Sequence, residues 1–345
     1  DDVESRGLGD VYKRQNMNNN FPKKILIIRQ GAIGDVVHTT ETYRSIKRLM
    51  PDSEIHYLTT KTPAELLYGD PDLTKLIILQ DRSYKGLFKL AKELKQEQYD
   101  LIINLQPSIR FKIFSFLCFS KQTVTYKKNF KYHAVENFFL TAKKAIKNLE
   151  LKKELCLYID EESISKTKKM LPPQHPIVVL NTQSGPVRHG RKWKMEYFRE
   201  LADSLIKEYN AQIIIIGSKE DAKKLDIFKN CNPNIHIVAG RLNLRETAAL
   251  LAQCDFMISG DTGPLHIATA TGHPVCIGLF GAMPIKRTGP WGEKHFAITS
   301  NLKCIPCNRR KCKFEKSEFN PCMNNLQPED VMTFIREKNL ITKSY

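Results

Sequence analysis

Short apolar runs alternate with amphipathic stretches along this chain from residue 24 to residue 340. The pattern is typical of parallel strands with helices on both faces of the sheet, because such strands are buried on both sides. One series of runs ends near residue 126 and a second begins at residue 177, so the sequence predicts an α/β fold with two domains. The expected strands are Lys24–Arg29, Glu54–Thr59, Lys75–Leu79, Asp100–Leu105 and Thr123–Tyr126, followed by Ile177–Asn181, Ala211–Ile216, Ile235–Val238, Phe256–Ser259 and Val275–Leu279.

Helical periodicity separates these runs, and breaks in it indicate the domain boundaries. We expect an N-terminal domain at 17–165, a proline-containing linker at 166–176 and a C-terminal domain at 177–345. Residues 1–16 have no sustained period and precede Met17, so we expect an extraneous or disordered tail there. Asn243, with Glu246 three residues later, is typical of a capping box. The expected helices are Val36–Met50, Tyr84–Gln98, Ser108–Phe119, Lys194–Tyr209, Glu220–Lys229, Leu244–Ala252, Pro264–Ala270 and Pro328–Lys338.

Length and charge limit the class of protein. With 345 residues the chain is long enough for two separate cores. Its net charge of +17 favours acidic partners such as nucleic acid, anionic lipid or a phosphorylated glycan. No apolar run approaches the ~20 residues of a membrane-spanning helix, and the start lacks the pattern of a secretory signal. We therefore expect a cytoplasmic protein that is soluble or lies on a membrane.

Two of the expected strands end in a glycine-containing turn that opens a helix. Gly31-Ala-Ile-Gly34-Asp35 follows the first strand, and Gly260-Asp261-Thr262-Gly263 follows a strand of the second half. The start of a helix presents free backbone N–H groups and the positive end of the helix dipole, which together favour an anion. The first turn has neither the dinucleotide-binding nor the phosphate-loop spacing. Ligands of open α/β sheets bind beyond the carboxyl ends of the strands, so we expect the ligand in a cleft between the halves.

Asp35 stands at the start of the first of these helices, and two interpretations of it stay open. Asp is a preferred N-cap residue, whose carboxylate accepts a hydrogen bond from a free helix N–H group. Alternatively, its carboxylate is a general base that points into the cleft. In the second turn, capping and binding are compatible, because Asp261 can build a turn that presents the Thr262 and Gly263 amides to a diphosphate. His266, one helical turn further, is either a packed residue or a ligand contact, and its spacing favours the ligand.

A basic cluster, Arg188–Trp193, follows the strand expected at Ile177–Asn181 and a loop that contains Ser184. Arg binds phosphate oxygens through a bidentate fork and Lys adds a point charge, so Arg191 and Lys192 suit a phosphate clamp. The alternative is an ordinary solvated surface. The position at the carboxyl end of a strand favours the phosphate site.

Four of the nine cysteines lie close together near the C-terminus. Four thiolates in such a span could bind a structural zinc, but zinc ribbons usually have two close pairs and this segment has one. Disulfides are disfavoured in a reducing cytoplasm, and reduced, buried thiols are the third alternative. We do not favour the zinc site and assign these thiols no catalytic role. They are Cys304, Cys307, Cys312 and Cys322.

Together, these segments resemble the heptosyltransferases of glycosyltransferase family 9, which build the inner core of lipopolysaccharide. The resemblance covers nearly the whole chain from Lys24 to Leu340. It is carried by residues 25–36, by Arg191-Lys192-Trp193 and by Gly217-Ser218-Lys219-Glu220. Its most specific part is Ser-Gly-Asp-Thr-Gly-Pro-Leu-His-Ile-Ala at 259–268, and the cysteine-bearing segment is also similar to that of many members.

The resemblance implies a GT-B fold of two Rossmann-like domains, with the acceptor bound mainly by the first and a nucleotide sugar, typically ADP-heptose, by the second. It implies that Asp35 is the base, with Gly31 and Gly34 in its cleft loop. Members commonly have Lys two places before the Trp, where this chain has Arg191 and then Lys192, so the charge of the clamp is kept. Glu220 is expected to meet the ribose. The expected donor contacts are Ser184, Arg191, Lys192, Glu220, Asp261, Thr262, Gly263 and His266.

These parts predict an inverting transfer. Asp35 would accept the proton of an acceptor hydroxyl while that oxygen attacks the anomeric carbon, through a transition state of oxocarbenium character. Arg191, Lys192 and the helix that opens at Thr262 would stabilise the departing nucleoside diphosphate. No Asp-x-Asp pair lies near the turns, which agrees with a metal-independent reaction that requires no cofactor.

The N-terminal half also mixes basic and aromatic residues, at Arg110, Lys112 and Lys121–His133. Such a surface can meet a phosphorylated, lipid-linked glycan acceptor and the anionic inner leaflet, so we expect a cytoplasmic enzyme peripheral to the inner membrane. Single-stranded nucleic acid is a weaker alternative, because the donor motifs do not require it. Other functions that stay open are a related transferase that uses another nucleotide sugar, a nucleotide-sugar epimerase on the same fold, and a non-enzymatic glycan- or nucleotide-binding module.

Overall fold

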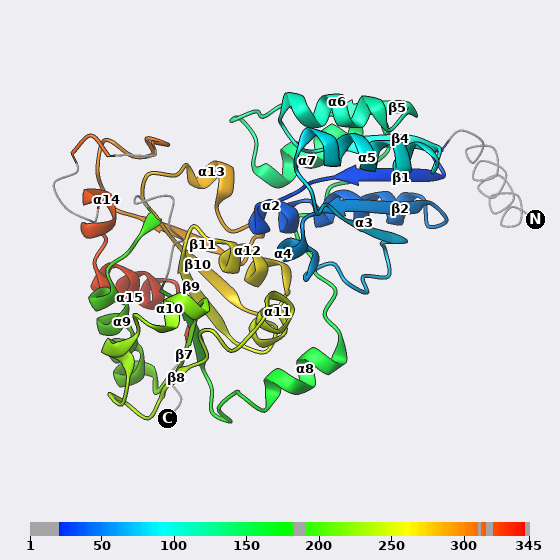
Figure 1. Cartoon of the computed structure of the whole chain (residues 1–345). Coiled ribbons are helices and arrows are strands. Elements are labelled where there is room, and N and C mark those ends of the chain that lie inside the picture. Colours follow the sequence, from blue (N-terminus) through cyan, green and yellow to red (C-terminus); the bar gives the residue numbers. More distant parts are fainter. Residues whose placement is uncertain (1–20, 183–190, 310–311, 315–319, 342–345) are drawn as a thin grey trace, which may run out of the picture.

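The structure is a computed structural model that describes residues 21–182, 191–309, 312–314 and 320–341, so the tail expected at 1–16 lies outside the described residues. Two lobes, each built around its own sheet, lie against each other (Figure 1). Every strand pair in these ranges is parallel. The prediction of two α/β domains with parallel sheets is therefore confirmed.

The N-terminal lobe consists of β1 (Lys24–Ile28), α2 (Ile33–His38), α3 (Thr40–Leu49), β2 (Glu54–Thr59), α4 (Lys61–Ala64), β3 (Lys75–Ile78), α5 (Tyr84–Lys95), β4 (Tyr99–Asn104), α6 (Ile109–Leu117), β5 (Ser120–Thr125) and α7 (Ala134–Lys143). Helix α8 (Glu161–Lys168) precedes the second sheet. The C-terminal lobe consists of β6 (Ile177–Asn181), α9 (Met195–Tyr209), β7 (Gln212–Ile216), α10 (Lys219–Ala222), a 3-10 turn η2 (Asp226–Phe228), β8 (Ile235–Ile237), α11 (Leu244–Leu251), β9 (Phe256–Gly260), α12 (Gly263–Ala270), β10 (Val275–Phe280), α13 (Ile285–Thr288), β11 (Phe296–Thr299), α14 (Pro321–Asn324) and α15 (Pro328–Glu337).

Each sheet reverses its direction of growth once. The strand order is β3-β2-β1-β4-β5 in the first lobe and β11-β10-β9-β6-β7-β8 in the second. The reversals fall between β1 and β4 and between β6 and β9, and ligands of such sheets bind where the reversal opens a crevice. Helix α2 follows β1 and α12 follows β9. Both turns singled out in the sequence therefore lie at these points.

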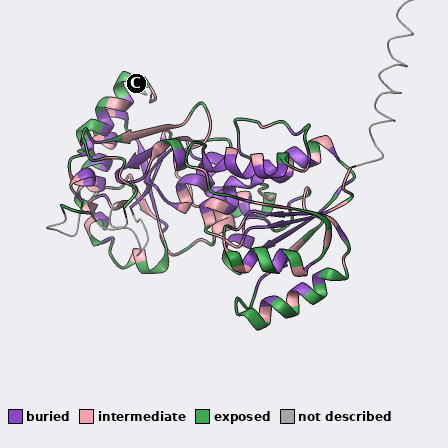
Figure 2. Ribbon diagram, turned by 90° about the horizontal axis from the view of Figure 1, so that it is seen from above, coloured by how far each residue is buried: buried purple, intermediate pink, exposed green. Residues whose placement is uncertain are grey.

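Strand β1 shows why the apolar runs have no polar alternation. Ile25 and Ile27 belong to the core formed with α3 and α7, whereas Leu26 and Ile28 belong to the core formed with α5 and α6. Both faces of the sheet are covered, so the four positions after Lys24 are all apolar and buried. Burial of each such side chain contributes about 1.5–3 kcal/mol. Figure 2 shows buried central strands and helices that alternate between buried and exposed residues, whereas the edge strands β5, β8 and β11 are partly exposed.

The helix expected over Val36–Met50 begins earlier and is broken. Helix α2 begins at Ile33, and a new helix, α3, begins at Thr40. At the break, the hydroxyls of Thr39 and Thr40 donate to the carbonyl oxygens three residues before them, at 2.6 and 2.8 Å. Such local bonds compete with the helical backbone pattern, which explains why hydrophobic periodicity did not reveal the break.

Other boundaries also differ from expectation. The helix expected at Glu220–Lys229 is two short pieces, α10 and η2, and β5 begins at Ser120 rather than Thr123. The expected capping box of α11 is confirmed, because the Asn243 side chain accepts from the Glu246 amide. The elements that the sequence did not predict are short or lie outside clear apolar periods: α4, α7, α8, α13, β11 and α14.

The segment between the lobes contains more structure than a linker. The linker expected at 166–176 begins inside α8, which packs on α11: Lys166 pairs with Glu246, and the Gln253 amide donates to the Thr167 hydroxyl at 2.8 Å. Helix α8 therefore contacts the second lobe, although most of it was expected in the domain at 17–165. None of the helices in the described ranges combines the length and apolarity needed to cross a bilayer.

Candidate active site

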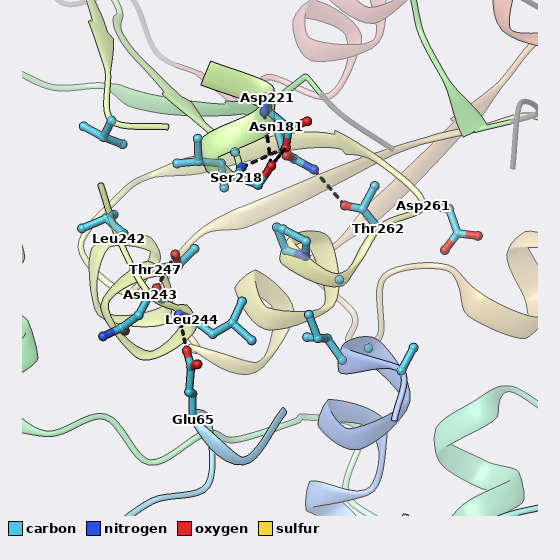
Figure 3. Close-up of a pocket in the computed structure, with 18 of the residues that line it drawn as sticks. Glu65, Asn181, Ser218, Asp221, Leu242, Asn243, Leu244, Thr247, Asp261 and Thr262 are labelled. Carbon is cyan, nitrogen blue, oxygen red and sulfur yellow. Dashed lines mark hydrogen bonds between the residues drawn. The ribbon is translucent and has the colours of Figure 1, made fainter. Parts of the chain in front are cut away.

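A cavity of about 520 Å³ lies where the two lobes meet. Its N-terminal wall is the turn into α2, and its C-terminal walls are the ends of β6, β7 and β9 and the start of α11 (Figure 3). The lining residues are Ala32, Ile33, Gly34, Glu65, Asn181, Arg191, Ile216, Gly217, Ser218, Asp221, Val238, Leu242, Asn243, Leu244, Thr247, Asp261, Thr262, Gly263 and Pro264. The cavity thus joins the two turns that the sequence singled out.

Asp35 directly follows the lining residue Gly34, and its carboxylate does not cap the helix. The N-cap of α2 is Ala32, and Asp35 lies inside the first turn. Its carboxylate pairs with the guanidinium of Arg29, which ends the first apolar run. Arg29 is itself buried, donates to the carbonyl oxygen of Leu105 at 2.7 Å and lies over the Phe138 ring at 5.0 Å. About a third of the Asp35 side chain remains accessible to solvent (33%), so its carboxylate is held in place yet reachable.

The turn into α12 is built around Asp261. The Asp261 carboxylate is buried, and it pairs with Arg191 at 2.8 Å and lies 3.4 Å from the His266 ring nitrogen. Arg191 also donates to the Asp261 carbonyl oxygen at 2.8 Å. Asp261 therefore holds Arg191 at the cavity wall, and Figure 3 shows its carboxylate turned away from Ser218 and Asp221.

Thr262 is the N-cap of α12, and its hydroxyl belongs to a buried polar network. The Asn181 side-chain amide donates to the Thr262 hydroxyl and to the Ser259 hydroxyl, both at 3.0 Å. These bonds fix the ends of β6 and β9 against the start of α12. The first amides of a helix have no partner within it, so Thr262 and Gly263 bring N–H donors that the helix itself leaves unused, together with the positive end of the dipole, to the cavity wall.

The two helix starts touch each other directly. A Cβ atom at Gly34 would collide with the His266 ring, and one at Gly263 would lie 3.3 Å from the Ile33 side chain. Glycine at these positions lets α2 of the first lobe approach α12 of the second, because no side chain separates them. Gly31, with φ +150°, makes the preceding turn.

Three histidines from the two lobes meet behind this contact. The ring nitrogens of His38 and His266 lie 3.2 Å apart, and the rings of His38 and His133 are 5.3 Å apart. Burial lowers the pKa of His38 well below its usual value, and the neighbouring His266, His133, Arg29 and Arg287 lower it further. Burial likewise lowers the pKa of His133 to about 4. Both rings are therefore neutral at pH 7.

The far end of the cavity has apolar walls and a few polar groups. Val238, Leu242 and Leu244 line it, as do Ser218 and Asp221. The Ser218 hydroxyl and amide both donate to the Asp221 carboxylate at 2.8 Å, which closes the capping box of α10. From the first lobe, the Glu65 carboxylate accepts from the Leu244 amide at 3.0 Å.

Several expected site residues lie elsewhere. Glu220 is exposed and does not line the cavity; its neighbour Asp221 does. Lys192 is half-buried beside Arg191 without lining the cavity, and Ser184 lies outside the described residues. Arg110 and Lys112 lie on α6, away from the cavity lining.

The four clustered cysteines are free thiols that surround a small separate hollow. Cys322 is buried, and burial together with the thiols of Cys307, Cys312 and Cys304 raises its pKa to about 11. Within the described ranges, no three His, Cys, Asp or Glu residues are arranged to bind a metal ion. The zinc alternative, which the sequence did not favour, therefore stays open.

Sequence reasoning missed Arg29, Asn181, Ser218 and Asp221. Arg29 ends an apolar run with a charge, and Asn181 ends another with an amide, which is the available signal for both. His38 and His133 carry no such signal, because only the packing of distant segments brings them to His266.

A cavity at the reversal points of two parallel sheets, lined by an anion-favouring helix start of one lobe and by the turn just before Asp35 of the other, is the arrangement of a glycosyltransferase of the GT-B type. The chain matches glycosyltransferase family 9 (heptosyltransferase) over residues 87–318, which is more than half of its length, and it belongs to that family.

Known relatives match along nearly the whole chain. Lipopolysaccharide core heptosyltransferase OpsX of Haemophilus influenzae is 25% identical over 342 residues, covering 93% of this chain and 95% of that protein. The crystal structure of a family 9 glycosyltransferase from Veillonella parvula superposes with a TM-score of 0.79 at 17% identity, over 92% of this chain and 97% of that one. The Escherichia coli heptosyltransferase WaaC with ADP superposes with a TM-score of 0.69 at 18% identity, over 91% and 99%. The GT-B prediction is confirmed.

Proposed function

We propose that this glycosyltransferase moves a heptose from ADP-heptose to the lipid A–Kdo inner core of lipopolysaccharide, with inversion at the anomeric carbon. The observation that carries the proposal is the cavity shared by the two lobes, in which the start of α12 and Arg191 lie opposite the turn that holds Asp35. Membership of family 9 and the similarity to OpsX, a lipopolysaccharide core heptosyltransferase, support the choice of sugar and acceptor.

The donor would occupy the cavity along its length. Its diphosphate fits the Thr262 and Gly263 amides and Arg191, because these supply hydrogen-bond donors and positive charge. Its nucleoside fits the far end, where Val238, Leu242 and Leu244 offer apolar walls to a base. Asp221, which lines the cavity, then takes the role expected of the exposed Glu220 as the acid that meets the ribose. The similar fold of WaaC, solved with ADP, supports an adenine nucleotide.

Asp35 would act as the general base. Its carboxylate takes the proton of the acceptor hydroxyl, that oxygen forms a bond to the anomeric carbon, and the bond from this carbon to the diphosphate oxygen breaks. ADP leaves with the bonding electron pair from the opposite face, so the configuration inverts. The negative charge that develops on ADP is stabilised by Arg191 and the start of α12.

We propose that this charge stabilisation does not depend on a divalent metal, because Arg191 and the helix start supply the positive charge themselves. Transfer activity is then expected to be unchanged after extensive dialysis against EDTA. A loss of activity that added Mg²⁺ or Mn²⁺ restores would contradict this.

The acceptor would approach from the N-terminal lobe at the cytoplasmic face of the inner membrane. The net charge of +17 and the basic residues at Arg110, Lys112 and Lys121–His133 suit a phosphorylated, lipid-linked glycan. Nucleic acid is not required by any group that lines the cavity.

Transfer is tested directly by incubating the protein with ADP-heptose and a heptose-deficient lipopolysaccharide acceptor. We expect the acceptor to gain the mass of one heptose and the new linkage to have the opposite anomeric configuration. An epimerase on the same fold would change the donor without any acceptor, and a binding module would bind ADP without turnover. Transfer from another nucleotide sugar but not from ADP-heptose would keep the enzyme class and overturn the donor.

A further inference from the structure

The outer face of the N-terminal lobe exposes several large apolar side chains on α5 and α6. We propose that these two helices form a docking surface for an anionic lipid bilayer, in which apolar side chains enter the headgroup region and basic side chains bind lipid phosphates. This docking surface deepens the proposed function. It rests on that function because the proposed acceptor is linked to a lipid and therefore lies in the membrane. Its main test does not require transfer.

Helix α6 is apolar on both sides. Phe111 and Phe114 point into the core and are fully buried. Ile109, Ile113 and Phe116, at i, i+4 and i+7, form the opposite face, and they are 75%, 52% and 73% exposed. A helix in contact with water normally carries polar residues on this face. The outer face of α6 is therefore suited to an apolar or interfacial environment.

Helix α5 extends this surface. Tyr84 and Phe88 are exposed, and Lys95 continues the same stripe of the helix. The Arg110 guanidinium of α6 lies 5.9 Å from the Tyr84 ring, and the Lys95 ammonium lies 4.3 Å from the ring of Phe119, which follows α6. These contacts at both ends place the two stripes side by side. The α5–α6 face comprises Tyr84, Phe88, Ile109, Ile113, Phe116 and Phe119.

The charges around the α5–α6 face select an anionic partner. Within the two helices the basic residues are Lys85, Lys89, Lys92, Lys95, Arg110 and Lys112, and the acid is Glu93. Aromatic and aliphatic groups among lysines are typical of helices that lie in a membrane interface, whereas protein interfaces are depleted in lysine. A second copy of this chain would bring two such positive faces together, and their repulsion disfavours that occupant.

The α5–α6 face also begins next to the candidate active site. Both helices start at the carboxyl edge of the sheet, where β1 ends. Ser108 caps α6, and the preceding loop is tied to the site because Arg29, the partner of Asp35, donates to the Leu105 carbonyl oxygen. A bilayer bound to this face would therefore lie beside the edge at which a membrane-anchored acceptor must reach Asp35.

Co-sedimentation with vesicles tests the proposal. We expect the full chain to bind vesicles of phosphatidylcholine with phosphatidylglycerol, and to bind pure phosphatidylcholine at least about tenfold less. The double variant Ile113→Ser/Phe116→Ser should bind the anionic vesicles at least about tenfold more weakly, since two apolar side chains no longer enter the interface. Phe314→Ser, which changes an exposed Phe of the other lobe, is the matched control and should bind like the wild type.

Equal binding of the double variant and the wild type to anionic vesicles would overturn the proposal. So would equal binding of the wild type to anionic and to neutral vesicles. Light scattering that shows a dimer for the wild type and a monomer for the double variant would also overturn the proposal, because the face would then serve self-association. An unchanged melting temperature shows that the variant is folded. Transfer to a detergent-dispersed acceptor should be retained in the variant. If transfer fails in the wild type while vesicle binding holds, only the proposed function fails.

Discussion

Helix α2 carries Asp35, and the ion pair with Arg29 orients its carboxylate. From the sequence, an Asp after a strand could be either an N-cap or a general base, and the spacing alone favoured the cap. The structure excludes the cap, because Ala32 holds that place and the carboxylate pairs with Arg29. Hydrophobic periodicity predicted β1 correctly. It could not predict that Arg29 pairs with Asp35, because a single charge at the end of an apolar run does not show which residue it contacts.

Replacing Arg29 with Gln should therefore impair catalysis without impairing donor binding. The variant removes the charge that holds Asp35 and leaves the Leu105 carbonyl oxygen with a weaker donor. Misplacement of a reacting group by about 1 Å lowers rates by up to ~100-fold, so we expect kcat to fall about 10- to 100-fold. Steady-state kinetics and calorimetry with ADP measure the two effects, and Arg29→Lys should recover part of kcat. An unchanged kcat in Arg29→Gln would contradict the positioning role.

At the scale of elements, the start of α2 in the first lobe and the start of α12 in the second are in direct contact. The apolar runs predicted nearly all of the strands, and the glycine turns predicted that a helix follows β1 and β9, although α2 begins at Ile33 rather than at Val36. What the sequence did not predict follows from local bonds and distant packing. The Thr39 and Thr40 hydroxyls break the first helix, and α8, whose end overlaps the start of the linker expected at 166–176, packs on α11. The contact between α2 and α12 also depends on distant residues, since it needs Gly34 opposite His266.

A methyl group at Gly34 should separate these two elements. The Cβ of Gly34→Ala would collide with the buried His266 ring, and overpacking of this kind lowers the free energy of unfolding by about 1–3 kcal/mol. Urea unfolding measures the change. The double variant Gly34→Ala/His266→Ala removes the obstructing ring, so its destabilisation should be smaller than the sum of the single effects. Strict additivity would show that the collision is not the cause.

At the scale of the whole molecule, a neutral histidine makes a hydrogen bond between the two lobes. His133 of the first lobe lies 3.0 Å from the Gly289 carbonyl oxygen of the second through Nε2, and its Nδ1 accepts from the Val135 amide at 3.2 Å. The ring is therefore neutral with its proton on Nε2. This contact was not predictable, because the sequence separates His133 from Gly289 by more than 150 residues.

Lowering the pH should reduce the free energy of unfolding through the titration of His133. The pKa of His133 is about 4 in the fold and about 6.5 when unfolded, so between these values the unfolded chain binds a proton that the folded chain does not. The free energy of unfolding should fall as pH drops from about 6.5 toward about 4, by up to about 1.4 kcal/mol per pH unit from this group, and His38 acts in the same direction.

Urea unfolding of the wild type and of His133→Gln at pH near 7.5 and near 5.5 measures the effect. The variant lacks the titrating ring, so its stability should depend less steeply on pH. An equally steep dependence in both proteins would remove His133 as the cause.

The most direct measurement compares heptose transfer and ADP binding in the wild type and in Asp35→Asn. Asn keeps the size of the side chain but cannot accept the proton, and loss of a general base typically lowers the rate by about 10²- to 10⁴-fold. Asp35 does not line the cavity, so the affinity for ADP should remain within about twofold of the wild type. Transfer by Asp35→Asn at the wild-type rate, or loss of ADP binding together with transfer, would contradict a base on the first lobe that faces a donor held by the second.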